Sequence, residues 1–455
     1  MKTGVVNNKF LVSQIRLDGK FNLSEGLQVR KLVHKSPWGI TSINEVTSDI
    51  YCPGIFQRHY VSSGIPFLGG ADIQKQEINS DKFLRKATTP NWKILEIKRG
   101  WTLVTCGGTI GLTAFANNLF TKCWVSQHVM RVIPSSIKEG MLYSYLSSKY
   151  GHLLLTTNTY GSVIPTLNAD NIGSLPIPLF PESFQAEVDN LIQESARLRE
   201  EANEKLEEAQ NKLSAFIKIK FNKVNFKTSR VNVKEVMSSL RHRIDPPALM
   251  SDGVYSMKEV NSKFTCKKIC KLKTKVFRPG IFKRIYVEEG IPYIKGSEIF
   301  LADPFRRCVH LSKSRTPFVD EMTLHEGQIL ITCAGSVGDI KIITKDYEDN
   351  KAIGSQDIIR LESTDPLYTK EYLFTYLRQP FVYDYIQSMK YGSVIERIEP
   401  FHVESIPVVE PTEELSKEIT SLIDEYMDCT YHAYTAENKA IKKVEDEIEK
   451  WNKAN

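Results

Sequence analysis

The sequence predicts an α+β protein with two similar mixed α/β domains, each followed by a long helix. Three observations support this fold class: a set of short motifs occurs twice in the same order, β-branched runs alternate with helix-like segments inside each copy, and a long segment of helical periodicity follows each copy. We expect a first domain at 1–180 with its helix at 181–224, and a second at 225–410 with its helix at 411–455.

The duplicated motifs define the two copies. In the first half and then in the second, they are PGIFQRHYVSSGIPFLGGADI (53–73) and PGIFKRIYVEEGIPYIKGSEI (279–299), LVTCGGTIG (103–111) and LITCAGSVG (330–338), SQHVMRV (126–132) and SQDIIRL (355–361), and YGSVI (160–164 and 391–395). The offset between partners only drifts from 226 to 231 residues. Small loop insertions between two copies of one domain explain this drift.

Apolar, β-branched runs predict buried strands in each copy, and two short segments predict helices. The expected strands are Thr102–Cys106, Val129–Ile133, Ile329–Cys333 and Ile358–Leu361, and the expected helices are Leu142–Ser148 and Glu371–Leu377. Glycine-containing turns follow the first and third of these strands. Such turns either bind a phosphate through backbone N–H groups or only join two strands, with Thr109 and Ser336 as candidate contacts.

A proline at 181 and another at 411 open the two long helices, in which apolar residues follow at steps of three and four. A helix of about 40 residues is about 60 Å long, and its narrow apolar stripe must be buried. We expect the helices to pair as an antiparallel coiled coil with pseudo-two-fold symmetry, the alternative being that each packs on its own domain. The candidate pairing residues are Val188, Leu191, Leu198, Leu206, Leu213, Ile419, Leu422, Tyr426 and Val444.

Two positions of the second stripe are occupied by glutamates, Glu437 and Glu447. Charged residues are rarely buried without a partner. We therefore expect Ile441 and Ile448 to turn inward in their place.

The composition is that of a soluble globular protein, with 41% hydrophobic and 25% charged residues in 455. No run approaches the roughly 18 apolar residues of a membrane helix, and the N-terminal residues lack the apolar core of a secretory signal. Cys266 and Cys270 have no second ligand pair at zinc-finger spacing and are expected to be structural thiols. These features favour a reducing cytoplasm.

Basic residues are concentrated in the second copy. Lys263–Arg284 holds nine Lys or Arg residues and no acid, whereas the matching Pro37–Arg58 holds one Arg and two acids. Such a block suits a polyanion such as DNA, although a solubilising surface has the same composition. Candidate phosphate contacts are Lys267, Lys268, Lys271, Lys273, Lys275 and Arg278.

Known catalytic motifs are absent from the sequence: it has no GxxxxGK[ST], HExxH or GxSxG. Asp245-Pro246-Pro247 is similar to the loop with which amino-methyltransferases hold a flipped base, but Ala248 replaces the stacking ring. We interpret Arg243–Asp245, like Arg16–Asp18, as a structural entry to its domain. The triplets Glu96-Ile97-Lys98 and Asp339-Ile340-Lys341 are nuclease-like by chance, since they are not equivalent in the two copies.

Together the GIPF–ADI and GIPY–SEI segments, CGGTIG and CAGSVG, the two SQ pairs, the two YGSVI strings and the proline-opened helices resemble the specificity subunit of Type I restriction–modification systems. The resemblance covers nearly the whole chain. It implies that each domain is a target recognition domain and that the helices space the two domains along DNA and dock methyltransferase subunits.

Candidate base-edge contacts lie beside the PGIF motifs, because Arg pairs well with guanine and Gln with adenine. They are Gln57, Arg58, His59, Lys283 and Arg284, with surface-strand residues as the alternative interpretation. Gln127 and Gln356 are expected to hold local turns. Tyr160, Ser162, Tyr391 and Ser393 either touch the DNA backbone or order a loop.

The resemblance implies a non-catalytic subunit that binds double-stranded DNA in a bacterial or archaeal cytoplasm. It would direct a partner adenine-N6 methyltransferase, with two such subunits, to an asymmetric bipartite site. The resemblance also admits a restriction endonuclease subunit as a further partner. The chain itself would carry no cofactor or metal, and S-adenosylmethionine would sit on the partner. Three alternatives stay open: a methylation-only or other defence complex without a restriction subunit, a fused two-domain methyltransferase, and a coiled-coil interaction protein with no DNA role.

Overall fold

The computed structural model describes residues 24–157, 166–219, 232–238 and 242–453. The chain divides into two compact units, each described here by itself: unit 1 holds 1–200 and 432–455, and unit 2 holds 201–431. None of the described helices combines the length and apolar content needed to span a bilayer.

Unit 1 is built on a four-stranded antiparallel sheet, the main sheet of this unit. Its order is β2 (Thr47–Tyr51), β8 (Val129–Pro134), β5 (Thr102–Thr105) and β6 (Thr113–Phe115). A three-stranded sheet has the order β4 (Phe83–Leu84), β3 (Ile65–Leu68) and β7 (Trp124–Val125). A two-stranded sheet pairs β1 (Ile40–Ser42) with β9 (Pro176–Pro178). The helices before the first long helix are α3 (Glu25–Val33), α4 (Ile43–Val46), α5 (Glu139–Ser147), α6 (Lys149–Thr157) and α7 (Ala169–Gly173).

Unit 2 repeats this plan. Its main sheet has the order β11 (Thr274–Phe277), β18 (Ile358–Ser363), β15 (Ile329–Thr332) and β16 (Ile340–Ile342). A second four-stranded sheet has the order β12 (Tyr286–Val287), β14 (Val309–Leu311), β13 (Ile291–Ile294) and β17 (Ile353–Gly354). A two-stranded sheet pairs β10 (Cys266–Lys268) with β19 (Pro407–Val409). Its shorter helices are α9 (Val233–Ser238), α10 (Pro246–Met250), α11 (Asp252–Lys263), α12 (Val319–Met322), α13 (Lys345–Asp349), α14 (Lys370–Leu377), α15 (Pro380–Met389) and α16 (Pro400–Glu404).

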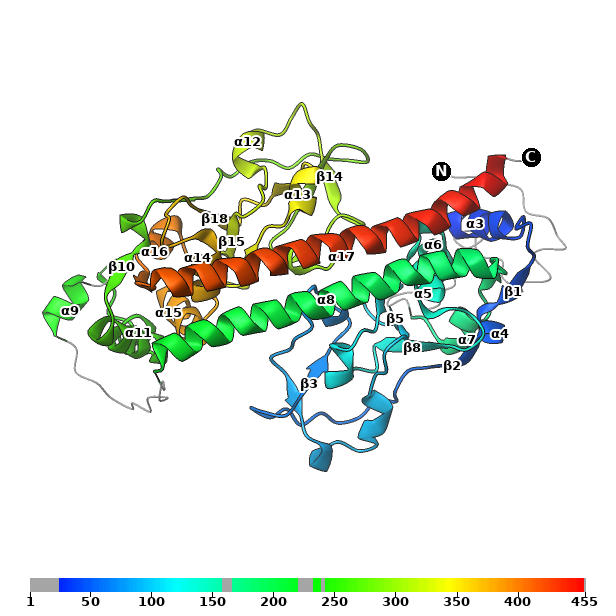
Figure 1. Ribbon diagram of the computed structural model, residues 1–455, viewed down its shortest axis with the longest axis horizontal. Coiled ribbons are helices and arrows are strands. Elements are labelled where there is room, and N and C mark those ends of the chain that lie inside the picture. The colour runs from blue at the N-terminus through cyan, green and yellow to red at the C-terminus, as the bar shows by residue number, and fades with distance from the viewer. Residues whose placement is uncertain (1–23, 158–165, 220–231, 239–241, 454–455) are drawn as a thin grey trace. The chain divides into compact units, whose positions relative to one another are not determined.

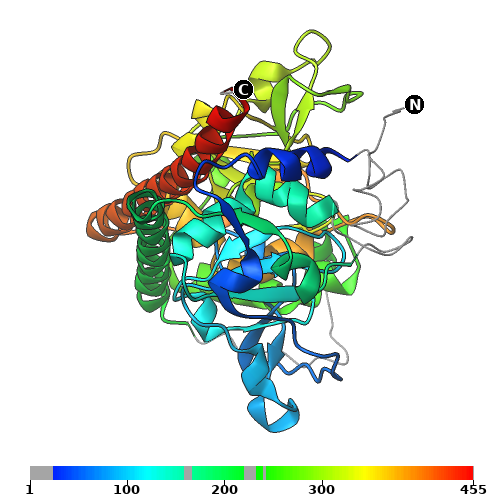
Figure 2. The same ribbon diagram turned by 90° about the vertical axis from the view of Figure 1, so that its right-hand side faces the viewer.

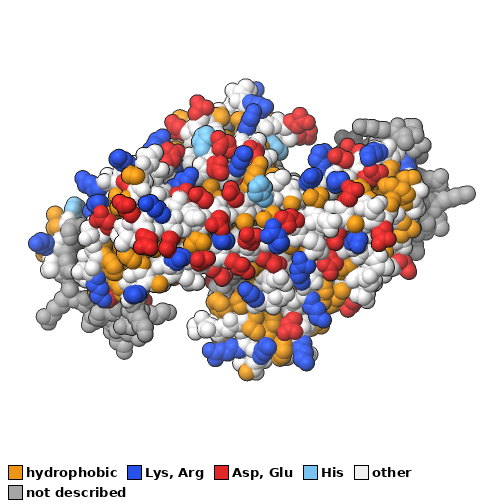
Figure 3. Space-filling model, in the orientation of Figure 1, with side chains coloured by type: hydrophobic (Ala, Val, Ile, Leu, Met, Phe, Trp, Pro, Cys, Tyr) orange, Lys and Arg blue, Asp and Glu red, His pale blue; other side chains and the backbone are white. Residues whose placement is uncertain are grey.

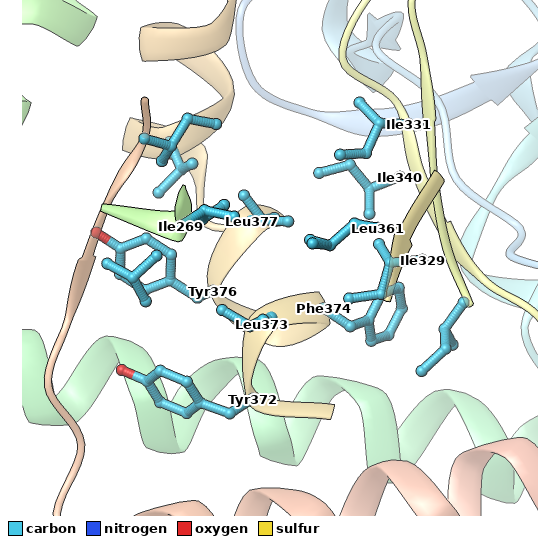
Figure 4. Close-up of a cluster of buried hydrophobic side chains, with 14 of the residues drawn as sticks. Ile269, Ile329, Ile331, Ile340, Leu361, Tyr372, Leu373, Phe374, Tyr376 and Leu377 are labelled. Carbon is cyan, nitrogen blue, oxygen red and sulfur yellow. The ribbon is translucent and has the colours of Figure 1, made fainter. Parts of the chain in front are cut away.

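The predicted strands and short helices are confirmed, with boundaries that differ by at most a few residues. β5 and β15 are buried along their whole length, as their β-branched sequences require. In unit 2 the apolar side chains of α14 fill the core next to the main sheet (Figure 4). The figure labels Tyr372, Leu373, Phe374, Tyr376 and Leu377 of α14, together with Ile269, Ile329, Ile331, Ile340 and Leu361 from other elements of the same core.

The two long helices are α8 (Glu182–Ile217) and α17 (Glu413–Lys453), and each contributes one segment to each unit (Figure 1). In unit 1 the Ser195 hydroxyl donates to the Ala433 carbonyl at 2.8 Å, and Lys443 pairs with Glu187 at 2.9 Å. Residue numbers rise along one helix as they fall along the other, so the segments run antiparallel.

In unit 2 the other two segments pair in the same way, with the roles of the helices exchanged. Lys205 contacts Glu425 at 2.5 Å, and Lys212 contacts Glu418 at 3.0 Å. These pairs are accessible to solvent, which screens their attraction, so they contribute little to stability. Figure 3 shows acidic and basic side chains intermixed along both helices, as expected of their solvent-facing sides. The predicted antiparallel pairing is therefore present within each unit.

Each domain core also includes residues of both long helices. In unit 1 the core contains Val188 and Ile192 from α8 and Val444 and Trp451 from α17. Trp451 lies with its ring centroid 5.7 Å from that of Trp38, and it belongs to the same apolar cluster as Val29 and Val33 of α3. The C-terminal end of α17 (red) lies near α3 (dark blue) in Figures 1 and 2. Pairing between helices and packing on a domain are thus not alternatives, because each helix does both. This double packing explains why Ile192 is buried although it lies outside the predicted narrow stripe.

The glutamate positions of the second stripe give a mixed result. Ile441 and Ile448 are buried as predicted, with exposed fractions of 5% and 0%. Glu437 is nevertheless buried as well. It accepts a hydrogen bond from the Tyr143 hydroxyl at 2.6 Å and pairs with Arg199 at 2.8 Å. A buried carboxylate with two such partners keeps its place in the interior.

Candidate nucleic-acid interface

The duplicated motifs of unit 2 gather at one end of its main sheet, which we call the loop end. The Cys333 N–H donates to the Asp357 carbonyl at 3.2 Å, which joins the CAGSVG turn to the SQD turn. The Ile398 N–H donates to the Cys333 carbonyl at 3.0 Å, which adds the segment after YGSVI. Arg278, at the end of β11, reaches Glu399 at 3.4 Å and adds the PGIF segment.

Unit 1 has the same loop end. The Cys106 N–H donates to the His128 carbonyl at 2.9 Å, and the Leu167 N–H donates to the Cys106 carbonyl at 3.2 Å. The Arg58 guanidinium reaches the Gln127 side-chain oxygen at 2.7 Å, which joins the PGIF segment to the SQ turn. Motifs far apart in the sequence therefore form one surface in each domain. Tyr160 and Ser162 lie outside the described residues.

A buried arginine supports each SQ turn, and the sequence reasoning missed both. Arg131 on β8 and Arg360 on β18 are fully buried. Each guanidinium donates to four backbone carbonyls: those of Leu95, Val125, Ser126 and Val129 for Arg131, and those of Met322, Gly354, Ser355 and Ile358 for Arg360. Burial lowers the pKa of each arginine to about 10, so both stay charged at neutral pH. The signal was present in the motifs SQHVMRV and SQDIIRL, whose arginines are aligned.

The arginines after PGIF occupy equivalent positions in the two domains. Arg58 lies over the ring of Phe67 at 5.3 Å, and Arg284 lies over the ring of Tyr293 at 5.6 Å. Arg58 is held by Gln127, whereas Arg284 approaches Asp357 at 3.6 Å. Both are half-buried at the edge of the loop end.

The other predicted base contacts beside PGIF are exposed. They are Gln57, His59 and Lys283. Each is adjacent in the sequence to Arg58 or Arg284, the arginines that lie over aromatic rings. These three side chains are free to reach a ligand at the loop end.

The glycine turns close hairpins between neighbouring strands of each main sheet. The Gly111 N–H donates to the Thr105 carbonyl, and the Gly338 N–H to the Thr332 carbonyl, both at 2.9 Å. Gly111 and Gly338 have φ values of 76° and 91°, which favour glycine over any other residue. The strand-joining interpretation of these turns accounts for their geometry. Thr109 and Ser336 are exposed at the tips.

The second YGSVI string is a small hairpin loop. Tyr391 donates from its hydroxyl to Glu399 at 2.7 Å and stacks on His402 at 5.6 Å between ring centroids. These contacts order the loop, which was one of the two roles considered for Tyr391. Ser393 is exposed beyond it.

The basic block of unit 2 is divided between the two ends of the main sheet. Arg278, Lys283 and Arg284 belong to the loop end. Lys267, Lys268, Lys271 and Lys273 precede β11, and the Thr364 N–H after β18 bonds to the Lys273 carbonyl at 2.9 Å. Lys267 pairs there with Glu410 at 3.1 Å. Lys275 is exposed within β11.

The candidate pairing residues of the long helices lie as follows. Val188, Leu213, Ile419 and Val444 have no exposed surface, and Leu191 is half-buried. The remaining four are buried: Leu198, Leu206, Leu422 and Tyr426. All of them except Leu198 belong to, or pack against, the shared cores of the units described above.

Two of the motifs considered for catalysis contain the described residues Asp245 and Lys341. Asp245 is bound by Arg243 and precedes the short helix α10, and this pairing holds the pKa of Asp245 below its ordinary value. Lys341 is almost fully buried within β16 and so is unavailable to a substrate. Among the described side chains, no group of three or more His, Cys, Asp or Glu could hold a metal ion. Arg16–Asp18 lies outside this part of the chain.

The family model for the Type I restriction modification DNA specificity domain matches residues 42–208 and again 258–443. The chain belongs to this family. The two matches cover most of each domain, together with parts of the long helices that follow them. The duplication seen in the motifs is therefore a duplication of the specificity domain.

Solved structures of the same subunit type are similar at low identity. The S subunit of a Type I system from M. genitalium is 13% identical, with 90% of this chain and 96% of that one covered and a TM-score of 0.37. The HsdS subunit from Thermoanaerobacter tengcongensis is also 13% identical, with 92% and 98% covered and a TM-score of 0.28. A chain from a study of complex assembly and conformational transition in the type I R-M system is 13% identical as well, with 92% and 97% covered and a TM-score of 0.28. No curated protein matches the sequence significantly.

Proposed function

We propose that this specificity-family chain is a non-catalytic DNA reader that directs a partner adenine-N6 methyltransferase to an asymmetric bipartite site. The observation that carries the proposal is the loop end of each domain. Four motifs separated in sequence come together there in unit 2, and three of them come together among the described residues of unit 1. They present exposed polar side chains around a buried, hydrogen-bonded scaffold. A rigid scaffold under exposed side chains is what reading base edges requires.

The asymmetry of the site follows from differences between the two loop ends. Gln57 in unit 1 is matched by Lys283 in unit 2, and His128 is matched by Asp357. An amide and an ammonium group, or an imidazole and a carboxylate, prefer different base edges. Two domains with different chemistry at the same positions therefore suit two different half-sites.

The long helices supply the second part of the proposal. A helix pair can hold two reading domains apart, so that they bind half-sites separated by bases that neither domain touches. Its exposed charged sides suit docking of two methyltransferase subunits, which would carry the S-adenosylmethionine. A complex that also contains a restriction subunit and one that only methylates are both compatible with this chain, which would act in the cytoplasm.

The fused-methyltransferase alternative makes a different prediction. It places a base-binding loop at Asp245, whose carboxylate is already paired with Arg243. The isolated chain should then bind S-adenosylmethionine in calorimetry. We expect no binding by the chain alone and binding by its complex with the methyltransferase.

The decisive test of the proposal is sequencing of DNA methylation in cells that produce the chain and its methyltransferase. We expect N6-methyladenine on both strands of a split, asymmetric motif. A variant with Lys283→Glu and Arg284→Glu tests the need for the second domain. It should lose methylation of the whole site, because both half-sites must be bound. A continuous palindromic motif, or unchanged methylation in this variant, would contradict the two-reader model.

A further inference from the structure

Each loop end exposes an isoleucine at the same position of its PGIF motif. Ile55 is 91% exposed and Ile281 is 78% exposed. Burying such a side chain would stabilise the fold, because it removes apolar surface from water. Single exposed apolar residues are common, but here the same exposed residue occurs in both copies of the domain.

The neighbours of these isoleucines force them outward. Pro53 and Pro279, two residues before, are buried. Phe56 packs edge-on against Phe67 with ring centroids 6.2 Å apart, and Phe282 packs on the matching cluster of unit 2. Because the chain is anchored on both sides, the residue between the anchors faces solvent. The exposure is therefore built into the backbone.

The surroundings of the isoleucines suit a base edge. Gln57 and Lys283 follow two residues later and are exposed, and the ring-held Arg58 and Arg284 follow them. An aliphatic side chain beside hydrogen-bond donors matches the major groove, where thymine presents a methyl group next to hydrogen-bonding atoms. A wedge inserted from the minor groove would instead require unstacking of bases.

We propose that Ile55 and Ile281 each pack against a thymine methyl group in the major groove, one in each half-site. This inference rests on the proposed function. Under that function each half-site contains a thymine, because methylation of adenine in each half requires an A·T pair there. The isoleucines then add specificity that hydrogen bonds alone do not supply.

The test uses the complex with the methyltransferase and duplexes that carry the methylated motif. Ile55→Ala and Ile281→Ala should each weaken binding about tenfold, in line with the discrimination of a good base contact. Replacing the contacted thymine by deoxyuracil removes only its methyl group. The deoxyuracil duplex should bind the unsubstituted complex more weakly by a similar factor. The complex with the alanine variant of the contacting domain should bind the thymine and deoxyuracil duplexes equally well.

Matched controls are Ile94→Ala in unit 1 and Ile244→Ala in unit 2, exposed isoleucines outside the PGIF motifs. We expect both to bind as the unsubstituted complex does. Unchanged affinity in the two PGIF variants, or a loss that is not coupled to any thymine, would overturn the inference. So would failure of these variants to co-elute with the methyltransferase, which would assign the isoleucines to a protein interface.

Failure of the proposed function has a different appearance. If the unsubstituted complex methylates no split motif, the DNA-reading role itself fails before any variant is compared. If it does methylate one and the variants behave like the controls, only the role of the isoleucines is lost.

Discussion

The loop ends of the two domains share a scaffold and differ in the side chains that this scaffold presents. Arg131 and Arg360 each bind four carbonyls and hold equivalent turns. Directly after the first strand of each main sheet, β2 or β11, the side chains differ: Cys52 in unit 1 is matched by Arg278 in unit 2. The comparison indicates that backbone hydrogen bonds fix the geometry of the surface. The surface side chains are then free to change what it reads.

The largest effect is expected from the shared scaffold. Arg131→Met and Arg360→Met should each lower the free energy of unfolding of their own domain by at least about 3 kcal/mol, because several buried carbonyls lose their donor. Hydrogen exchange of β8 and β18 in the assembled complex measures each domain separately. Arg58→Met, at a half-buried arginine, is the control and should cost far less. A large effect in one domain alone would show that the scaffolds are not equivalent.

The helix segments provide the next comparison. Glu437→Ala should destabilise unit 1 by about 3 kcal/mol, because it leaves the largely buried Arg199 without its carboxylate. At the matching places unit 2 has only apolar or neutral residues: Leu206, Phe374 and Thr430.

Copying these residues into unit 1 tests whether the polar group is needed for stability. The variant with Tyr143→Phe, Arg199→Thr and Glu437→Leu should regain most of the stability lost in Glu437→Ala, as measured by urea unfolding. A triple variant as unstable as the single one would show that the two cores are packed differently.

A smaller effect is expected at the SQ turns. His128→Asp gives unit 1 the carboxylate that unit 2 has at Asp357, and should change base preference in one half-site only, by about tenfold. Methylation sequencing with the variant measures this change. A loss spread over both half-sites would mean that His128 supports the structure and does not take part in reading.

The smallest effect concerns Cys52, a thiol whose matching residue in unit 2 is Arg278. A hydrogen bond from Cys106 and the nearby Arg131 guanidinium lower the pKa of the exposed Cys52 to about 6, against a partial burial that raises it. Above pH 7 Cys52 is therefore mostly thiolate, and its rate of alkylation by iodoacetamide should stay constant while an ordinary thiol still gains rate through pH 8.5. Peptide mass spectrometry gives the rates.

The variant Cys106→Ala is the control for that measurement. Without the donor the pKa of Cys52 should rise and its alkylation should become strongly pH-dependent. In unit 2, burial raises the pKa of Cys333, so this thiol should react slowly at every pH. Equal rates for Cys52 and Cys333 would contradict the difference between the loop ends.

The sequence predicted the duplication, two strands of each main sheet (β5, β8, β15 and β18), the short helices α5 and α14, and the long helices, because each has a local pattern. The other strands of the main sheets and the other short helices were not predicted. It did not predict which motifs meet. That depends on the strand order β2-β8-β5-β6, in which β2 pairs with β8 from a distant part of the chain. The burial of Arg131 was missed because its partners are backbone carbonyls, which no residue type announces. Burial of Glu437 was missed because its partner Tyr143 lies 294 residues away.

The sharing of each core between both long helices has a consequence for synthesis of the protein. Domain 1 is encoded first, yet its core needs Ala440, Val444, Ile448 and Trp451 from α17. All of residues 201–431 leave the ribosome before these side chains do. Contacts between such distant residues form slowly because a long loop must close first. Domain 1 must therefore wait with an incomplete apolar core, and a chain stopped before residue 432 would keep that surface open to aggregation.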